Sequence, residues 1–367
     1  MKIPFVNLDR QYEGLKGEVH EAIDRVLVSK AFILGPFVAQ FESEFAAFSG
    51  TKHAVGCSSG TSSISLILEA AGVGQGDEVI TAGHTFAASA GAIRHVGAVP
   101  VFVDVEPRAY TIDPVAIEKA ITPRTKAILP VHIYGTPCDM TAIGAIAARH
   151  NLVVVGDSAQ AHGATLNDVG VGALGTAASF SFYPGKNLGA YGDAGAMTTN
   201  DDALAARLRK LRDHGRMSKY AHDIVGYNHR MDAIQGAILS VKLKRLAQWN
   251  ERRRTLAAQY DAAFRPRGFK TIEPPANARS VYHLYVVEVA DREALQKALA
   301  DRGIATGVHY PIPLHRQPAF APWGEGAHLP VTEKIAERIV SLPICGDLSD
   351  DEQAYVIAAF LDLAKPA

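Results

Sequence analysis

Two segments decide the fold, LVVVGD at residues 152–157 and SFSFYPGKNLGAYGDAGA at residues 179–196. The first is an apolar run without polar alternation, which is typical of a strand covered on both faces. It ends at Asp157, and the second segment runs from a strand-like stretch into a Gly- and Pro-rich turn that holds Lys186. Open α/β sheets bind ligands beyond the carboxyl ends of their strands. The two segments therefore predict a buried sheet with a site at its edge.

The same pattern extends outward from these segments over residues 53–199. Strand-like and helix-like stretches alternate in HAVGCSS (53–59), TSSISLILEAAG (61–72), DEVITAG (77–83), TFAASAGAIRHV (85–96), VPVFVDV (99–105), KAILPVHIYG (126–135), MTAIGAIAARHN (140–151) and AGAMTTN (194–200). This alternation predicts an α/β protein with a mostly parallel, doubly wound sheet.

The chain changes character after a long helical stretch from Asp232 to about Phe264. Residues 265–279 are polar, Pro-rich and linker-like, which indicates a domain boundary nearby. Further strand-like and helix-like stretches follow, including a helix expected over VTEKIAERIVS (331–341). We assign residues 1–250 to a large domain with an N-terminal arm and residues 251–367 to a small C-terminal α+β domain.

The charge balance predicts no polyanionic partner. The 37 Lys and Arg residues face 38 Asp and Glu residues, and the basic stretch 242–254 is interpreted as the solvated face of a helix. Cys57, Cys138 and Cys345 form neither a CxxC pair nor a zinc-ligand spacing. With no stretch apolar enough to span a membrane, we expect a cytoplasmic protein without nucleic-acid or membrane partners.

Two apparent motifs are set aside. GVGALG (170–175) matches GxGxxG but leads into a strand-like stretch, which is the reverse of the context that a dinucleotide fingerprint needs. None of the 14 histidines forms HExxH or a comparable ligand spacing, so no metal site is expected. A Rossmann oxidoreductase and a metal hydrolase are both disfavoured.

Lys186 is the sharpest candidate for chemistry. Gly residues around it allow the backbone to approach a ligand closely, and Ser181 supplies a hydroxyl nearby. A lysine at such a strand end can be an ordinary surface cation. The alternative is amine chemistry on a carbonyl, because a Schiff base is one of the few uses for a lone lysine in a tight polar turn.

Three further features admit a structural and a functional interpretation. Asp157 either caps the next segment or holds a pyridinium N–H. Gly60 and Thr61 open a helix that either has an ordinary N-cap or binds a phosphate at its N-terminus. Phe86 either fills the core or stacks on a flat ring.

Taken together, five ordered motifs resemble the DegT family of pyridoxal-phosphate-dependent sugar-nucleotide aminotransferases. The motifs are SGT (59–61), TF (85–86), DSAQAHGA (157–164), SFYPGKNLGAYGDAGA (181–196) and GYNHRMDAIQGAIL (226–239). The resemblance spans nearly the whole chain. It implies the aspartate aminotransferase fold (fold type I), with a seven-stranded, mostly parallel sheet in the large domain.

The resemblance also implies roles for individual residues. Lys186 would carry pyridoxal 5'-phosphate (PLP) as a Schiff base and move the proton between cofactor and substrate. Asp157 would pair with the pyridine nitrogen, and Gln160 would contact the 3-oxygen of the ring. Phe86 would stack on the ring face. Further cofactor contacts are implied for the phosphate, namely Gly60, Thr61 and Ser181, with Asn228 reaching the cofactor of the neighbouring subunit in a homodimer with shared active sites.

The activity implied is a ping-pong amino transfer from L-glutamate to a nucleotide-linked ketosugar. The form YPGKNLGAYGDAGA is most similar to members that aminate C3 of a dTDP-linked 3-keto-6-deoxyhexose. Members acting at C4 or on UDP-linked N-acetyl sugars, a PLP enzyme of another reaction type and a non-catalytic regulator are the alternatives. Implied substrate contacts are Tyr183, Lys219, Tyr220, His309, Tyr310 and His315.

Three departures from the family pattern stand near these motifs. Gly156 precedes Asp157 where relatives commonly carry an acidic residue, and Gly83-His84 stand where a proline-containing turn is common. Ser62-Ser63-Ile64 follow Thr61 where an Ala-Leu pair is frequent. None falls on an implied cofactor contact, so the departures concern substrate fit rather than catalysis.

Overall fold

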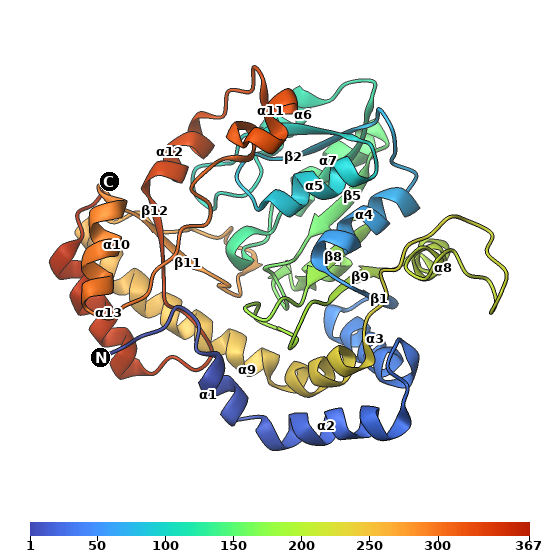
Figure 1. The fold of residues 1–367 in the computed structure, drawn as a ribbon. Helices are drawn as coiled ribbons and strands as arrows, with labels where there is room; N and C mark the ends of the chain where they lie inside the picture. Colours follow the sequence, from blue (N-terminus) through green and yellow to red (C-terminus); the bar gives the residue numbers. More distant parts are fainter.

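A computed structural model describes residues 1–367, and a seven-stranded sheet lies at the centre of its larger part (Figure 1). Its strands are β1 (His53–Cys57), β2 (Glu78–Ala82), β3 (Val99–Val103), β4 (Thr125–Leu129), β5 (Val153–Asp157), β8 (Ala177–Ser181) and β9 (Gly195–Thr199). Their order is β1-β9-β8-β5-β4-β2-β3. All neighbouring strands are parallel except where β9 pairs with β1 and β8. The predicted α/β class with a mostly parallel sheet is confirmed.

Helices cover both faces of this sheet. One face packs against α4 (Gly60–Ala70), α5 (Ala87–His95) and α8 (Asp202–Leu211). The other packs against α2 (Lys16–Ser29), α3 (Gly35–Ser49), α6 (Pro114–Ala120), α7 (Met140–His150) and the first half of α9 (Ala233–Phe264). Val154 lies in the core on one face, whereas Val155 lies in the core on the other. Burial on both faces explains why this strand has no polar residue before Asp157.

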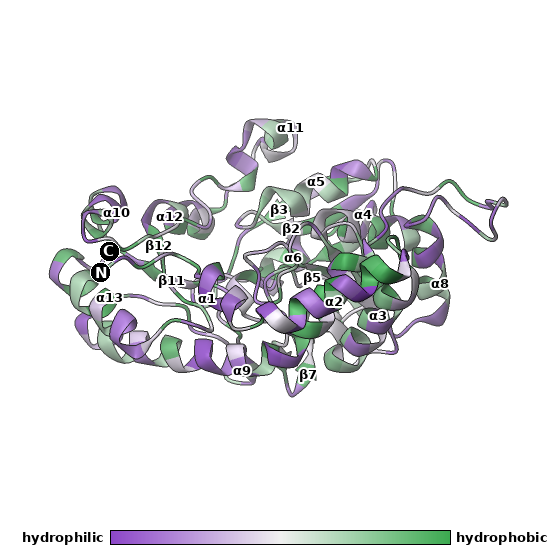
Figure 2. Cartoon of the chain, turned by 60° about the horizontal axis from the view of Figure 1, so that its bottom comes forward, coloured by the Kyte–Doolittle hydropathy of each residue, from purple (hydrophilic) through white to green (hydrophobic).

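The 32-residue helix α9 takes part in two hydrophobic cores. Leu239 and Leu246 pack in the core of the large sheet, and Leu256 and Tyr260 pack in the C-terminal core. The helix runs without a break through residue 250, and the division of domains there stays a prediction. Figure 2 shows hydrophilic and hydrophobic segments alternating along α2, as expected for a helix with one buried side. In α9, by contrast, residues 233–243 include no exposed residue.

The interpretation of residues 242–254 as a solvated face is wrong for two basic residues. Lys242 and Arg253 are only 1% and 4% exposed. The Lys242 ammonium donates to the carbonyl oxygen of Gly189, and Arg253 Nη1 donates to three carbonyl oxygens, one of them Ile344 O at 2.9 Å. Buried cations need such acceptors, which here come from segments distant in sequence.

The C-terminal core surrounds a two-stranded antiparallel sheet. Its elements are β11 (Tyr285–Glu288), β12 (Ile339–Leu342), α10 (Arg292–Asp301), α12 (Pro330–Arg338) and α13 (Asp350–Leu363). The helix expected over 331–341 is too long, because it ends at Arg338 and Ile339–Leu342 pair with β11. All four residues of β12 are buried, so tertiary strand pairing overrides the local helical pattern.

Short elements complete the chain. They are α1 (Leu8–Glu13), α11 (Ala321–Gly324) and a small three-stranded sheet of β6 (Thr165–Leu166), β7 (Val169–Gly170) and β10 (Ala278–Arg279). None of the helices combines the length and the apolar character that crossing a membrane requires.

Candidate active site

The candidate site lies at the carboxyl edge of the large sheet. β1, β2, β4, β5 and β8 all run in the same direction, so their carboxyl ends meet at one edge. Gly60, Phe86 and Lys186 follow the ends of β1, β2 and β8, while Asp157 and Ser181 are themselves the last residues of β5 and β8. The topology therefore gathers residues that are up to 126 positions apart in sequence.

Asp157 is a buried carboxylate, 5% exposed, without a hydrogen-bonded cation. Its Oδ2 accepts a hydrogen bond from Ser89 Oγ (2.8 Å), and its Oδ1 accepts one from Ala159 N (3.2 Å). Burial raises the pKa of Asp157, and these hydrogen bonds together with the charge of Lys186 oppose that shift. The carboxylate both caps its own turn and retains acceptor capacity for a cationic ligand.

Lys186 projects from a tight turn. Its backbone N–H donates to Tyr183 O at 2.9 Å, and a Cβ on Gly189 would lie 2.3 Å from Pro184 O, so only glycine fits there. Burial lowers the pKa of Lys186 to about 8, although the charge of Asp157 opposes the shift. No protein group accepts a hydrogen bond from Lys186 Nζ, so the amine is free to react.

The residue after this lysine anchors the turn. Asn187 Nδ2 donates to Asn250 Oδ1 (2.9 Å) on α9 and to Val281 O (3.1 Å), and Asn187 Oδ1 accepts from His283 Nδ1 (3.1 Å). Asn250 Nδ2 donates in turn to His162 O at 2.8 Å. Because both asparagines are buried and each donates its amide N–H to acceptors of the protein, the network fixes the lysine turn.

Three neutral histidines surround the lysine. Burial and the charge of Lys186 lower the pKa of His162 to about 3, that of His309 to about 4 and that of His283 well below its ordinary value. These rings are uncharged at neutral pH. Lys186 is therefore the group of this set whose pKa lies nearest the physiological range, as a proton carrier requires.

An anion cradle lies at the N-terminus of α4. Ser59 and Ser62 form a capping box, while the N–H groups of Gly60 and Thr61 stand in the first turn, where no preceding turn accepts them. A Cβ on Gly60 would lie 2.6 Å from Ser181 Cβ, which shows how closely the two loops approach. The free N–H groups of Gly60 and Thr61, with the hydroxyls of Thr61 and Ser181, suit a phosphate.

Gln160, Phe86 and Tyr310 form one wall. Gln160 Oε1 accepts from Tyr134 N (2.5 Å), which directs Gln160 Nε2 toward Tyr310, and Nε2 donates to the Tyr310 hydroxyl at 3.1 Å. The Phe86 and Tyr310 ring centroids are 5.6 Å apart, and Phe86 is 56% exposed. Exposure of this phenylalanine excludes the core interpretation and leaves its face open to a planar ligand.

Three predicted contacts lie on an extended segment, residues 212–232, that projects beyond α8 (Figure 1). Lys219, Tyr220 and Asn228 are all exposed, and the Lys219 ammonium lies 5.2 Å from the Tyr220 ring centroid. None of the three forms a hydrogen bond or ring contact with the other predicted site residues of this chain. Their roles stay predictions, as does the dimer in which Asn228 would act.

Two more predicted substrate contacts differ in their surroundings. Tyr183 is exposed beside the lysine turn. His315 is buried, and its Nε2 pairs with Glu333 Oε1 on α12 at 2.8 Å. The structure thus gives His315 a partner within the protein, and substrate contact by this residue stays a prediction.

Sequence reasoning missed four residues at this edge, namely Ser89, Tyr134, Asn187 and His283. Tyr134 belongs to PVHIYG, which directly follows β4, so the carboxyl-edge rule points to it. The other three gain their roles from partners 63 to 96 residues away or on another strand. No local pattern identifies them.

The residues at this edge fit PLP. The cofactor offers a ring N–H, a phosphate, a 3-oxygen, a flat ring and an aldehyde. The chain presents an acceptor carboxylate, a phosphate cradle, an amide donor, an exposed aromatic face and an unpartnered amine, which are Asp157, the α4 N-terminus, Gln160, Phe86 and Lys186.

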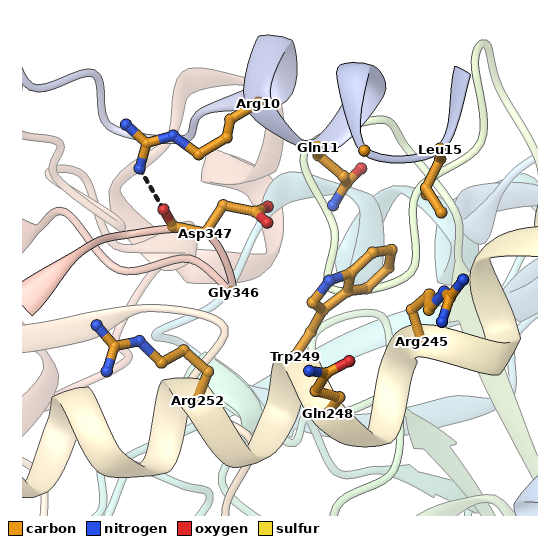
Figure 3. Close-up of a pocket in the computed structure, with 10 residues that line it drawn as sticks. Arg10, Gln11, Leu15, Arg245, Gln248, Trp249, Arg252, Gly346 and Asp347 are labelled. Atoms are coloured by element: carbon orange, nitrogen blue, oxygen red, sulfur yellow. Dashed lines mark hydrogen bonds between the residues drawn. The ribbon is translucent and has the colours of Figure 1, made fainter. Parts of the chain in front are cut away.

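A separate polar pocket of about 330 Å³ lies between α1 and α9 (Figure 3). Its arginines are already paired, Arg10 with Glu352, Arg245 with Glu18 and Arg252 with Asp350. Its lining contains none of the predicted site residues and comprises Arg10, Gln11, Gly14, Leu15, Arg245, Gln248, Trp249, Arg252, Gly346 and Asp347.

Known proteins show close similarity to the whole chain. A protein from Geobacillus stearothermophilus described as a pleiotropic regulatory protein is 48% identical over 97% of both chains. A dTDP-3-amino-3,4,6-trideoxy-alpha-D-glucose transaminase from Streptomyces venezuelae is 45% identical over 99% of this chain and 97% of its own. A UDP-N-acetyl-3-dehydro-alpha-D-glucosamine 3-aminotransferase from Acidithiobacillus ferrooxidans is 44% identical over 96% of each chain.

The solved structures agree with these relatives. The crystal structure of S. venezuelae DesV in complex with a ketimine intermediate superposes with a TM-score of 0.97 at 44% identity, covering 100% of this chain and 99% of that one. Residues 14–361 match the model of the DegT/DnrJ/EryC1/StrS aminotransferase family. The expected resemblance is confirmed, and the chain belongs to this family of PLP-dependent sugar aminotransferases.

Proposed function

We propose that this enzyme uses PLP to move the amino group of L-glutamate to the C3 keto group of a dTDP-linked 3-keto-6-deoxyhexose, by a ping-pong mechanism. The observation that carries this proposal is the arrangement of Lys186 and Asp157 at one sheet edge beside the α4 cradle. The 45% identical dTDP-amino-sugar transaminase supports the substrate class.

PLP, when bound, would supply a ring that accepts the electron pair released at the substrate carbon. Lys186 holds the cofactor and carries the proton, because its amine has a pKa of about 8 and no competing partner. Asp157 keeps negative charge beside the ring nitrogen. The N–H groups of Gly60 and Thr61 bind the phosphate, and Phe86 orients the ring.

The proposed assembly is a homodimer in which Asn228 completes the neighbouring site. We also propose a cytoplasmic location, which agrees with a sugar nucleotide as the substrate. L-glutamate would enter first and leave as 2-oxoglutarate, and the ketosugar would then receive the stored amino group.

The first experiment is an absorbance spectrum of the purified enzyme with PLP, recorded before and after L-glutamate and again after dTDP-3-keto-6-deoxyglucose. Loss of the visible band with glutamate and its return with the sugar, together with the mass of an amino-sugar product, would support the proposal. Lys186→Ala should abolish both the band and the transfer. Transfer at the wild-type rate by Lys186→Ala would overturn the role of the lysine.

A second candidate substrate is a UDP-linked N-acetyl-3-ketosugar, which is favoured by the 44% identical relative that acts on one. The same spectrum with this sugar separates the two, because only the true acceptor restores the band. If no band forms with PLP at all, a regulatory role, as in the name of the 48% identical relative, replaces the proposal.

A further inference from the structure

The loop that carries Phe86 packs directly against a C-terminal segment, residues 309–329, that crosses back onto the large domain. Leu314 N donates to Gly83 O at 2.8 Å. A Cβ on Gly83 would lie 2.4 Å from Leu329 Cδ1, so the segment rests on this backbone. Leu314 and Leu329 are buried in one small core with side chains of α5 and β3, and Figure 1 shows α11 of this segment near α5.

A buried chain of hydrogen bonds joins the same two parts of the molecule. His84 and Tyr134 are each 1% exposed. The Tyr134 hydroxyl donates its single proton to the carbonyl oxygen of His309, so it accepts from His84 Nε2. This assigns the neutral Nε2–H tautomer to His84. Burial lowers the pKa of His84 to about 4, in agreement with an uncharged ring.

Tyr134 is held at both of its ends. Its backbone N–H donates to Gln160 Oε1, while its hydroxyl binds the segment that carries Tyr310. Its φ is +60°, a left-handed conformation that is uncommon for a bulky residue and persists only where its surroundings hold it. One residue therefore links the cofactor wall, through its backbone, to the C-terminal segment, through its side chain.

We propose that His84 and Tyr134 are positioning residues for the nucleotide sugar. Their hydrogen-bonded chain holds His309 and Tyr310 over the site and sets the wall on its sugar side. Neither residue touches the reacting atoms, since both act through the His309 carbonyl. The inference rests on the proposed function, because it takes the large acceptor to be a nucleotide-linked ketosugar. L-glutamate is much smaller and depends less on this wall.

The variants Tyr134→Phe and His84→Ala each break the chain. His84→Ala removes one neutral hydrogen bond of the chain, and Tyr134→Phe removes two. Loss of one such bond corresponds to roughly 2- to 10-fold, so each variant should raise the KM for the ketosugar by at least about twofold, and Tyr134→Phe should have the larger effect. The glutamate half-reaction should change less than about twofold. Since Tyr134→Phe already removes the bond that His84 makes, the double variant should add less than about twofold to Tyr134→Phe alone.

Amide hydrogen exchange over residues 309–316 provides a readout that needs no substrate. It should accelerate in both variants of the enzyme loaded with PLP, because the segment loses its anchor. Tyr260→Phe is the matched control, since it removes another buried hydroxyl that donates to a backbone carbonyl, Pro343 O at 2.8 Å, in the C-terminal core. This control should leave both the ketosugar KM and the exchange of 309–316 unchanged.

An unchanged ketosugar KM, equal losses in the two half-reactions or additive effects in the double variant would overturn the inference. Failure of the wild-type enzyme to aminate the sugar would instead overturn the proposed substrate. In that case the exchange measurement still decides, because unchanged exchange in Tyr134→Phe would show that the chain does not anchor the segment. If His84→Ala fails to fold, Tyr134→Phe, which removes only an oxygen, carries the test alone.

Discussion

Asp157 is prepared for a ligand that carries positive charge. Its two oxygens accept hydrogen bonds from Ser89 and Ala159, yet burial still raises its pKa, so the ionised form lacks full compensation within the protein. A ring N–H donor would supply that compensation. Burying the Asp157 carboxylate therefore costs free energy in the protein without a ligand, and a bound cationic group would remove that cost.

Replacing Asp157 by Asn keeps the side-chain volume and removes the charge. We expect amino transfer to fall by on the order of 10²- to 10³-fold, because the ring nitrogen loses the charge that keeps it protonated. Covalent attachment of PLP to the lysine should persist. Stopped-flow absorbance of the glutamate half-reaction measures the first effect, and a static spectrum measures the second. Wild-type kinetics in Asp157→Asn would contradict the assigned role.

The lowered pKa of Lys186 also makes a prediction for the protein without cofactor. Between pH 8 and the ordinary lysine value of 10.5, the unfolded chain binds a proton that the folded chain does not. The contribution of this group to the free energy of unfolding therefore rises with pH across that window. Lys186→Met removes this contribution. In denaturant titrations, the free energy of unfolding should therefore rise less between pH 8 and pH 10 in this variant than in wild type. Parallel pH dependences would refute the shift.

At the scale of elements, the α4 N-terminus requires glycine at position 60, because there is no room for a Cβ. Gly60→Ala places a Cβ 2.6 Å from Ser181 Cβ, so the two loops must separate. We expect PLP to bind at least about 10-fold more weakly and the protein to lose about 1–3 kcal/mol of stability from overpacking. Titration of PLP absorbance and thermal unfolding measure the two effects.

Gly144→Ala is the control for this variant. Gly144 lies on the exposed side of α7, and a Cβ there meets nothing within 4 Å. Alanine is the better helix former, so stability should stay equal or increase slightly. Equal PLP affinity in Gly60→Ala and Gly144→Ala would argue against a phosphate cradle at α4.

Elements show where sequence patterns succeed and where they fail. The unbroken apolar run of β5 predicts a central strand, and the turn around Lys186 predicts a site, because both signals are local. The pattern over 331–341 fails, since the pairing of β12 with β11 decides the state of Ile339–Leu342. Position after β4 could have pointed to Tyr134, but its link to the C-terminal segment could not be predicted, as its hydroxyl partner His309 lies 175 residues further along the chain.

At the scale of the whole molecule, a variant in the projecting segment 212–232 can test whether active sites are shared between subunits. If Asn228 serves the neighbouring site, a hybrid of Lys186→Ala and Asn228→Ala subunits contains one intact site. Mixing the two inactive variants should then restore up to about half of the wild-type activity per hybrid dimer. Activity assays after co-expression measure this, and absence of restoration would place Asn228 in the site of its own subunit.

The long helix α9 has a thermodynamic consequence for the molecule. It contributes Leu239 and Leu246 to one core and Leu256 and Tyr260 to the other, without an intervening loop. If either core unfolded, the half of α9 that packs in it would lose its tertiary contacts, and the helix would be destabilised as a whole. The two cores should therefore lose their structure in a single calorimetric transition, so that the chain behaves as one cooperative unit despite its size.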